Sequence, residues 1–176
     1  MNSLVYGNGA ASPVIVMGVS GCGKTTLGSA LAERLNATFL DADDFHPEAN
    51  VAKMRAGTPL SDDDRAPWLS ALNRELRTRS VAGEQLVLAC SALKKNYRTA
   101  IGADLPQARW IFLEGGFELI AARMRARPNH YMPESLLRSQ FKALERPAAA
   151  ITISIVLSAV EQVDAALYGL QMKSAH

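Results

Sequence analysis

A glycine-rich segment, Gly18-Val19-Ser20-Gly21-Cys22-Gly23-Lys24-Thr25, could bind the phosphates of a nucleotide. It matches the pattern G-x-x-x-x-G-K-[ST] at every fixed position, between a β-branched run and an amphipathic helical pattern. Glycines let the backbone curl around phosphate oxygens, the lysine reaches the β- and γ-phosphates, and the threonine hydroxyl binds Mg²⁺. We find no N-K-x-D element for reading guanine, which favours ATP over GTP. The residues predicted to bind the nucleotide are Gly18, Ser20, Gly21, Cys22, Gly23, Lys24, Thr25 and Thr26.

An acidic segment, Asp41-Ala42-Asp43-Asp44-Phe45-His46-Pro47, follows the second predicted strand. Ligands of open α/β sheets bind beyond the carboxyl ends of the strands. At strand spacing Asp41 and Asp43 point to the same side, so we expect Asp41 to hold Mg²⁺ and Asp43 to accept the proton of an acceptor hydroxyl. The alternative is an acidic turn with helix caps. His46 is either a turn residue or a substrate contact.

Charged residues of both signs come next along the chain. Lys53 and Arg55 either form salt bridges with the acids around them or meet an anionic acceptor. In Asp62-Asp63-Asp64-Arg65, a carboxylate can accept hydrogen bonds from sugar hydroxyls, while Arg65 can bind a carboxylate. The three acids suit the first turn of a helix equally well, and both interpretations stay open.

Bases gather in the second half of the chain. Ser91, Lys94 and Arg98 follow the third predicted strand. We expect Ser91 to cap a helix, and Lys94 and Arg98, four residues apart, to share one face of it. That face either binds an anion or is a solvated helix face.

A second basic group lies near a proline-bounded segment. Arg123 and Arg127 are four residues apart and are favoured over Arg125, which lies on another face. They predict a lid over about residues 123–140 that closes over phosphate. Positive charge there would stabilise the transferring phosphoryl group, and closure would exclude water.

Short apolar runs alternate with helical patterns, which is typical of an α/β fold with a parallel sheet. We predict one doubly wound domain, residues 14–176, after a flexible arm, residues 1–13. The predicted strands are Val14–Met17, Thr38–Leu40, Leu86–Cys90, Trp110–Leu113 and Ile151–Leu157. The predicted helices are Thr26–Leu35, Glu48–Arg55, one from Asp62 through Leu76, Ala92–Ile101, Phe117–Arg125, Glu134–Glu145 and Ala159–Leu170.

Composition limits the class of protein. The 176 residues, 48% hydrophobic and 20% charged, suit one globular domain and exclude a disordered, collagen-like or coiled-coil chain. The net charge of +2 gives no argument for nucleic acid or membrane as a partner. The charges are distributed unevenly along the chain. Residues 41–64 contain seven acids and two bases, and residues 74–146 contain thirteen bases and seven acids. Two cysteines, no visible secretory signal and no long apolar run predict a cytoplasmic protein.

Several stretches of the sequence resemble the gluconokinases, a family of carbohydrate kinases. The resemblance covers about residues 14–147, and its most selective parts are Asp43–Pro47, Pro59–Arg65 and Ser91–Lys95. Two places depart from the family pattern: Pro128-Asn129 stands where a glycine is usual, and Val156–Ser158 lacks an acidic residue. The matching stretches are Met17–Thr25, Asp41–Pro47, Asn50–Gly57, Pro59–Leu69, Cys90–Arg98 and His130–Pro147.

This resemblance implies ATP- and Mg²⁺-dependent phosphorylation of D-gluconate at the 6-hydroxyl, giving 6-phospho-D-gluconate for the pentose phosphate or Entner–Doudoroff routes. It also implies a P-loop NTPase fold of the nucleoside-monophosphate-kinase-like type, with a helical lid and usually as a homodimer. By position, the catalytic residues would be Lys24, Asp43, Arg123 and Arg127, with Thr25 and Asp41 at the metal. The substrate-binding residues would be Asp43, His46, Lys53, Arg55, Asp64, Arg65, Ser91, Lys94, Arg98, His130 and Gln140.

Two rival interpretations stay open. Another small-molecule kinase of this fold, such as a shikimate or nucleotide kinase, would keep the phosphate loop. A shikimate kinase would not be expected to have both Asp43–Pro47 and Asp62–Arg65. A regulatory module that binds a nucleotide without chemistry would not need Lys24, Thr25 and both carboxylates of the acidic segment.

Overall fold

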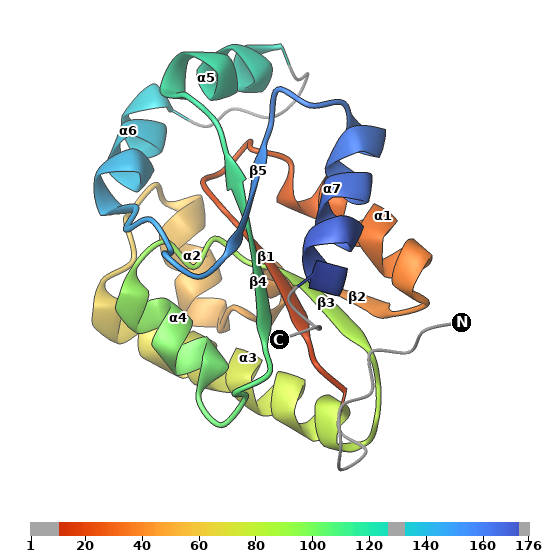
Figure 1. Ribbon diagram of the computed structural model, residues 1–176. Coiled ribbons are helices and arrows are strands. Elements are labelled where there is room, and N and C mark those ends of the chain that lie inside the picture. The colour runs from red at the N-terminus through yellow and green to blue at the C-terminus, as the bar shows by residue number, and fades with distance from the viewer. Residues whose placement is uncertain (1–10, 127–132, 173–176) are drawn as a thin grey trace.

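The computed structural model describes residues 11–126 and 133–172, and these form a parallel β-sheet between layers of helices (Figure 1). The strand order is β2-β3-β1-β4-β5, and each neighbouring pair is parallel, as in a doubly wound α/β fold. The strands are β1 (Val14–Met17), β2 (Thr38–Asp41), β3 (Leu86–Ala89), β4 (Arg109–Glu114) and β5 (Ile151–Ser154). The helices are α1 (Lys24–Leu35), the 3₁₀ turn η1 (Ala42–Phe45), α2 (Glu48–Arg55), α3 (Asp62–Val81), α4 (Lys95–Gly102), α5 (Phe117–Arg125), α6 (Glu134–Ala143) and α7 (Ala159–Met172).

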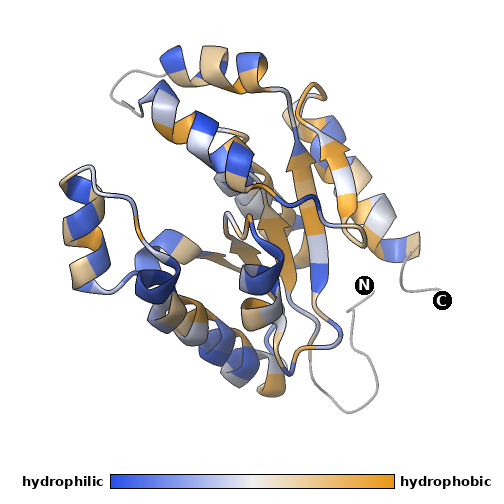
Figure 2. Ribbon diagram, turned by 90° about the vertical axis from the view of Figure 1, so that its left-hand side faces the viewer, coloured by the Kyte–Doolittle hydropathy of each residue, from blue (hydrophilic) through white to orange (hydrophobic). Residues whose placement is uncertain are grey.

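The central strand β1 shows how the two helical layers are held. Its residues are all fully buried, and they alternate between two hydrophobic clusters. Val14 and Val16 pack into the cluster of α1, α5 and α7, whereas Ile15 and Met17 pack into the cluster of α3 and α4. A strand covered on both faces carries continuous apolar residues, as this one does. Figure 2 shows the apolar strands enclosed by helices with hydrophilic outer surfaces.

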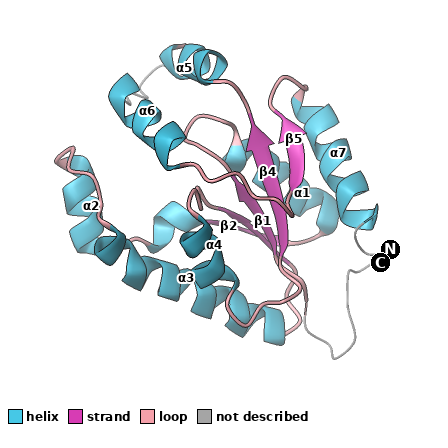
Figure 3. Cartoon of the chain, turned by 60° about the vertical axis from the view of Figure 1, so that its left-hand side comes forward, coloured by secondary structure: helices cyan, strands magenta, loops and turns pink. Residues whose placement is uncertain are grey.

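The carboxyl ends of the parallel strands meet at one edge of the sheet. In Figure 3 the arrow of β4 points toward the end of the molecule where α5 and α6 lie. The segment after β1 leads directly into α1, and β2 leads directly into η1. This edge therefore collects the segments in which the sequence places its candidate site residues.

The predicted N-terminal arm, residues 1–13, is wrong from Ala11 onward. Ala11 and Ser12 are buried. The Ala11 amide donates to Ser80 O at 3.0 Å, and Ser12 Oγ donates to Gln107 Oε1 at 3.2 Å. These contacts attach the segment before β1 to α3 and to the loop before β4, whereas residues 1–10 lie outside the described residues.

Of the predicted element ends that differ from the structure, three have a visible cause. Strand β5 ends at Ser154 because a turn follows, in which Ser154 Oγ accepts from the Val156 amide at 3.2 Å. Helix α6 ends at Ala143 because the Glu145 amide instead donates to Leu93 O at 2.9 Å. Helix α4 begins at Lys95 rather than at residue 92, for a reason given below.

One finding concerns membranes. Within residues 11–126 and 133–172, no helix combines the length and the apolar character that crossing a lipid bilayer requires.

Candidate active site

The loop between β1 and α1, residues 18–25, can only be built with glycines at its turns. A Cβ at Gly18 would lie 2.8 Å from Cys22 Sγ, and a Cβ at Gly21 would lie 2.6 Å from Met124 Cγ. Both glycines also have positive φ angles, 149° and 78°. No side chain caps the N-terminus of α1, so its first amides are left for a ligand. The described geometry thus suits a phosphate-binding loop.

Lys24 and Thr25 follow this loop in the first turn of α1. Lys24 Nζ donates to Val19 O at 3.0 Å, so the lysine folds back over the loop. Thr25 Oγ1 donates to Asp41 Oδ2 at 3.2 Å. The structure therefore brings together the two residues predicted for the metal, although they lie on different elements. Ser20, Cys22, Gly23 and Thr26 lie in the same loop and turn.

The argument that placed Asp41 and Asp43 on one side of a strand is wrong. Strand β2 ends at Asp41, and Asp43 lies in the 3₁₀ turn η1. The reason is a cap: Asp41 Oδ1 accepts a hydrogen bond from the Asp43 amide at 3.1 Å. The segment therefore forms the capped acidic turn that the sequence left open as an alternative. This turn still places the carboxylates of Asp41 and Asp43 at the end of β2. One oxygen of Asp41 faces the phosphate loop, and the other fixes the turn.

The Asp43 side chain stays 89% exposed, so an acceptor can reach it. Crowding by surrounding protein groups raises the pKa of the Asp43 carboxyl, and the nearby charge of Asp41 raises it further. Lys24 acts in the opposite direction. A carboxylate with a raised pKa is a better proton acceptor than an ordinary surface carboxylate.

His46 lies behind Asp43 rather than at the surface. Its ring stacks on Trp68, with 4.2 Å between centroids and an interplanar angle of 11°. Its Nε2 lies 4.0 Å from Asp43 Oδ1, and burial lowers the pKa of His46. Trp68 also donates from Nε1 to Ala42 O at 2.8 Å. The stacked rings therefore support η1 from its buried side. We interpret His46 as a neutral residue that positions this turn.

Lys53 and Asp64 join α2 to the start of α3. Lys53 Nζ lies 2.6 Å from Asp64 Oδ1, and the pKa of Asp64 is lowered to about 2 by this contact and by hydrogen bonds from Ser61. Ser61 and Asp64 form a capping box at the start of α3. Arg55 is exposed in the last turn of α2. The helix-start interpretation is therefore confirmed for Asp64, and Lys53 is paired with it.

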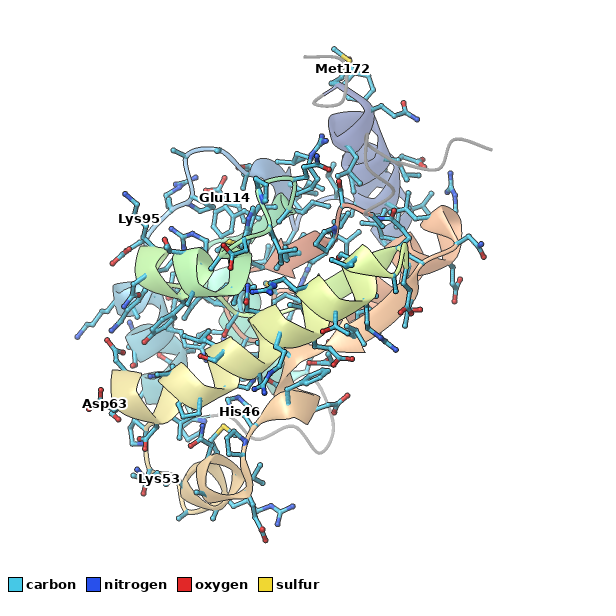
Figure 4. The ribbon with its side chains drawn as sticks, turned by 90° about the horizontal axis from the view of Figure 1, so that it is seen from below. His46, Lys53, Asp63, Lys95, Glu114 and Met172 are labelled. Carbon is cyan, nitrogen blue, oxygen red and sulfur yellow. The ribbon has the colours of Figure 1, made fainter. Side chains whose placement is uncertain are left out.

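A second ion cluster joins α3 to α4. Lys94 Nζ lies 2.9 Å from both carboxylate oxygens of Asp62, and Tyr97 Oη donates to the same carboxylate. Arg65 NH1 lies 3.9 Å from Asp62 Oδ1. Figure 4 shows Asp63 and Lys95, which neighbour this cluster in sequence, on the same side of the molecule as Lys53. We call Asp62, Arg65, Lys94 and Tyr97 the Asp62 cluster.

The turn after β3 differs from its prediction. Ser91 does not cap α4: Lys94 is the N-cap residue without a cap bond from its own side chain, and the Lys95 amide donates to Glu145 Oε2 at 2.6 Å. Arg98 donates to Ala92 O at 3.0 Å and to Leu93 O at 2.9 Å, and Ala92 has a positive φ of 43°. These bonds hold the turn open and delay the helix, so Lys94 and Arg98 do not share a helix face. Ser91 remains at the edge, where its carbonyl accepts from the Gly18 amide at 3.4 Å.

The predicted lid is described only in part. Arg123, on α5, donates from NH2 to Ile155 O at 2.7 Å, which ties α5 to the end of β5. Arg127 and His130 lie outside the described residues. Helices α5 and α6 stand side by side above the sheet in both Figure 1 and Figure 3.

Gln140, on α6, reaches the phosphate loop. Its Oε1 accepts from the Ser20 amide at 2.7 Å, and its Nε2 donates to Ser20 Oγ at 2.9 Å. Gln140 thus contacts the phosphate loop, and its contact with the acceptor stays a prediction. Because both ends of the amide are used, Gln140 fixes the orientation of α6 relative to the loop.

Sequence reasoning missed two aromatic residues of this region. The sequence places Trp68 in the helix after Asp62-Asp63-Asp64-Arg65, but nothing in its spacing indicates a stack with His46 across two elements. Tyr97 could have been noticed because it lies three residues after Lys94. A phenol that contacts a carboxylate of another helix, however, is visible only in three dimensions.

The fold and this edge define a class of protein. A parallel sheet with a glycine-rich phosphate loop after β1, and carboxylates at the end of β2, is the arrangement of a P-loop kinase of the nucleoside-monophosphate-kinase-like type.

Comparison with known proteins narrows this class. The family model described as shikimate kinase matches residues 20–163. The thermosensitive gluconokinase of Escherichia coli (strain K12) is 48% identical over 140 residues, which cover 80% of this chain and 75% of that protein. The crystal structure of a gluconokinase from Sinorhizobium meliloti 1021 is 39% identical with a TM-score of 0.85, covering 93% of this chain and 94% of that one. Shikimate kinase from Aquifex aeolicus vf5, at 20% identity, a TM-score of 0.60 and coverage of 93% of this chain and 98% of that one, shares the fold. The chain belongs to the shikimate kinase family as that model defines it and, within it, to the gluconokinases.

The stacked pair of His46 and Trp68 makes a spectroscopic prediction. A protonated imidazole quenches the fluorescence of a stacked indole, so Trp68 emission should fall as the pH drops through the pKa of His46. Because burial lowers that pKa, the midpoint should lie below the ordinary value of about 6.5. The measurement uses a Trp110→Phe background, which leaves Trp68 as the remaining tryptophan of the two. His46→Gln is the control and should remove the transition, whereas a midpoint at or above the ordinary value would contradict the buried, neutral ring.

Proposed function

We propose that this chain transfers the γ-phosphoryl group of ATP to the 6-hydroxyl of D-gluconate. The observation that carries the proposal is that the phosphate loop and the acceptor-side carboxylates meet at one point, through Thr25, Asp41 and Asp43. The acceptor is supported by identities of 48% and 39% to proteins named gluconokinase. The homodimer, the cytoplasmic location and the metabolic route implied by the resemblance stay predictions.

The donor side is formed by the phosphate loop and the first turn of α1. The glycine turns and the uncapped helix N-terminus favour negatively charged phosphate groups. Lys24, which rests on Val19 O in the present structure, needs only to turn its ammonium to reach the β- and γ-phosphates. Gln140 keeps Ser20 of the loop in place from α6.

Thr25 and Asp41 fit a magnesium ion. A hydroxyl and a carboxylate oxygen 3.2 Å apart are hard oxygen ligands, and Mg²⁺ takes its remaining ligands from phosphate and water. When bound, the ion neutralises charge on the phosphates. The thiols of Cys22, in the phosphate loop, and Cys90, after β3, are not suited to bind the ion, because burial raises the pKa of both and keeps them protonated.

On the acceptor side, Asp43 orients the attacking hydroxyl and takes its proton. Its raised pKa suits that role, and the His46–Trp68 stack keeps η1 in position. Arg65 and Lys94 are the bases proposed for the acceptor's carboxylate, because both lie beside the carboxylate of Asp62. Arg65 NH1 also donates to the carbonyl oxygens of Leu60 and Ser61, as Arg98 does to two carbonyls before α4. Arg55 and Ser91 complete the acceptor side.

The remaining part of the site is the group of residues that would contact the phosphoryl group during its transfer. Arg123 lies on α5 near the end of β5. Together with Arg127, which lies outside the described residues, it is proposed to contact the group during transfer, whereas His130, also outside them, is proposed to contact the acceptor. Bases at this position would stabilise the developing charge.

The choice of acceptor is tested by measuring ADP release with a panel of acceptors. Gluconate should support turnover in the presence of ATP and Mg²⁺, whereas shikimate and nucleoside monophosphates should give rates close to the background of ATP hydrolysis. The separate acceptor helices α2 and α3 and their ion pairs are the physical reason for this selectivity. Turnover with shikimate above that with gluconate would overturn the proposal, and ATP binding without transfer to any acceptor would favour the regulatory module.

The role of Asp43 makes a prediction about rate and pH. Asp43→Asn removes the proton acceptor and should lower kcat by about 10²-fold or more. Asp44→Asn, an exposed neighbour in the same turn, is the matched control and should stay close to wild type. Because Asp43 acts only when ionised, kcat of the wild type should fall as the pH drops, with a midpoint above the ordinary carboxyl value of 3.8. Wild-type kcat in Asp43→Asn, or an acidic limb that persists in that variant, would contradict the role.

A further inference from the structure

The carboxylate of Asp62 is held as a bound anion would be. It receives both a bidentate contact from Lys94 Nζ, at 2.9 Å to each oxygen, and the hydroxyl of Tyr97. Arg65 NH1 lies 3.9 Å away. The hydroxyl and the two bases come from α3 and from the start of α4, and together they form a carboxylate-binding arrangement.

Tyr97 organises this arrangement. Its ring is buried, with Arg65 Cζ 5.6 Å and Lys94 Nζ 5.3 Å from the ring centroid. Burial and the bond to Asp62 raise the pKa of Tyr97, so the phenol stays protonated and acts as a donor. Hydrogen bonds from Tyr97 and Lys94 lower the pKa of Asp62, which is therefore ionised in the free enzyme. Lys94 and Arg65 would therefore remain in place around another carboxylate bound where the Asp62 carboxylate lies.

Lys94 is the base that contacts Asp62 directly, whereas the other bases on the acceptor side, Arg65 included, also hold parts of the backbone or a helix cap. Lys53 is paired with Asp64, which also caps α3, so breaking that pair would cost the helix its cap. Arg98 holds the turn before α4 through two backbone carbonyls. In contrast, Asp62 is 52% exposed and makes no capping contact among the described residues. The Asp62 side chain can therefore move away from Lys94 and Tyr97 without the loss of a helix cap.

We propose that Asp62 occupies the subsite for the acceptor's carboxylate in the free enzyme and is displaced by it, which makes Asp62 a specificity-determining residue. This inference rests on the proposed function, because it requires an acceptor that carries a carboxylate. The exchange replaces one carboxylate by another, so the bases never stay without a counter-ion. A neutral polyol of the same length offers no such replacement and would leave Asp62 in place. Selection for a sugar acid over a sugar alcohol follows from this exchange.

The substitution Asp62→Asn tests the exchange, because it keeps the shape of the side chain and removes its charge. Since the acceptor no longer competes with an internal carboxylate, KM for gluconate should fall about two- to five-fold, the range that a half-exposed ion pair allows. kcat should stay within about two-fold, because Asp62 touches no reacting atom. Acetate, a carboxylate without hydroxyls, should inhibit Asp62→Asn at concentrations that leave the wild type unaffected.

Asp63→Asn is the matched control. It removes the same charge from the same helix turn, where Asp63 is exposed, and it should leave both KM and the response to acetate unchanged. If Asp62→Asn does not fold, as judged by its thermal unfolding midpoint, Asp62→Ser replaces it, because serine also suits the start of a helix.

Two results would overturn the inference. A higher KM in Asp62→Asn would mean that Asp62 accepts hydrogen bonds from the acceptor's hydroxyls, and an unchanged KM without acetate inhibition would mean that the pair is purely structural. Both results are read against a wild type that phosphorylates gluconate. If the wild type itself does not use gluconate, the proposed function fails first, so the two failures are distinguishable.

Discussion

One carboxylate, Asp41, connects the two halves of the candidate site. Its Oδ2 accepts from Thr25 at the phosphate loop, and its Oδ1 accepts from the amide of Asp43. The residue stands at the end of β2, the edge strand beside β3, so it must reach across the sheet edge to the loop that follows β1. Asp41 thereby connects the phosphate loop to the 3₁₀ turn that carries the acceptor-side carboxylate of Asp43. The transfer of a phosphoryl group requires this closeness, because donor and acceptor must be held in line.

Two carboxylates near this point, Asp62 and Asp64, are paired with bases of the protein. The acids of residues 41–64 and the bases of residues 74–146 do not form two separate surfaces. Lys53 pairs with Asp64 inside the acidic stretch, and Lys94 crosses from the basic stretch to Asp62. A site for two anions is therefore kept stable when empty, because internal carboxylates balance its bases. In the proposed displacement of Asp62, binding of an anionic acceptor is an exchange of partners rather than a new neutralisation.

The sequence alone was sufficient for the features that depend on local pattern. The strand cores of β1 and β3, the helices α2 and α5 and the phosphate loop are predicted correctly, because apolar runs and glycine spacing are local signals. The chemistry expected of Lys24, Thr25 and Asp41 also follows from that loop, and the contact of Thr25 with Asp41 agrees with it.

The features that sequence reasoning missed depend on contacts between distant segments. The start of α4 moves to Lys95 because Arg98 bonds back to Ala92 and Leu93. Gln140 meets Ser20 over a separation of 120 residues. His46 is held by a stack with Trp68 that no spacing rule describes. In each case a side chain satisfies a backbone group or a ring of another element, and only the folded chain determines which one.

The most direct test of this account is the magnesium dependence of gluconate phosphorylation in Asp41→Asn. The asparagine keeps one carbonyl oxygen, but it loses the charge and the second acceptor oxygen with which Asp41 serves both Thr25 and Asp43. The account predicts that kcat falls about 10²-fold or more, in the range of an electrostatic contact at a reacting phosphate. It also predicts that half-saturation requires more Mg²⁺, while the thermal unfolding midpoint stays close to wild type. Wild-type kcat at the wild-type Mg²⁺ concentration would show that Asp41 does not join the two halves of the site.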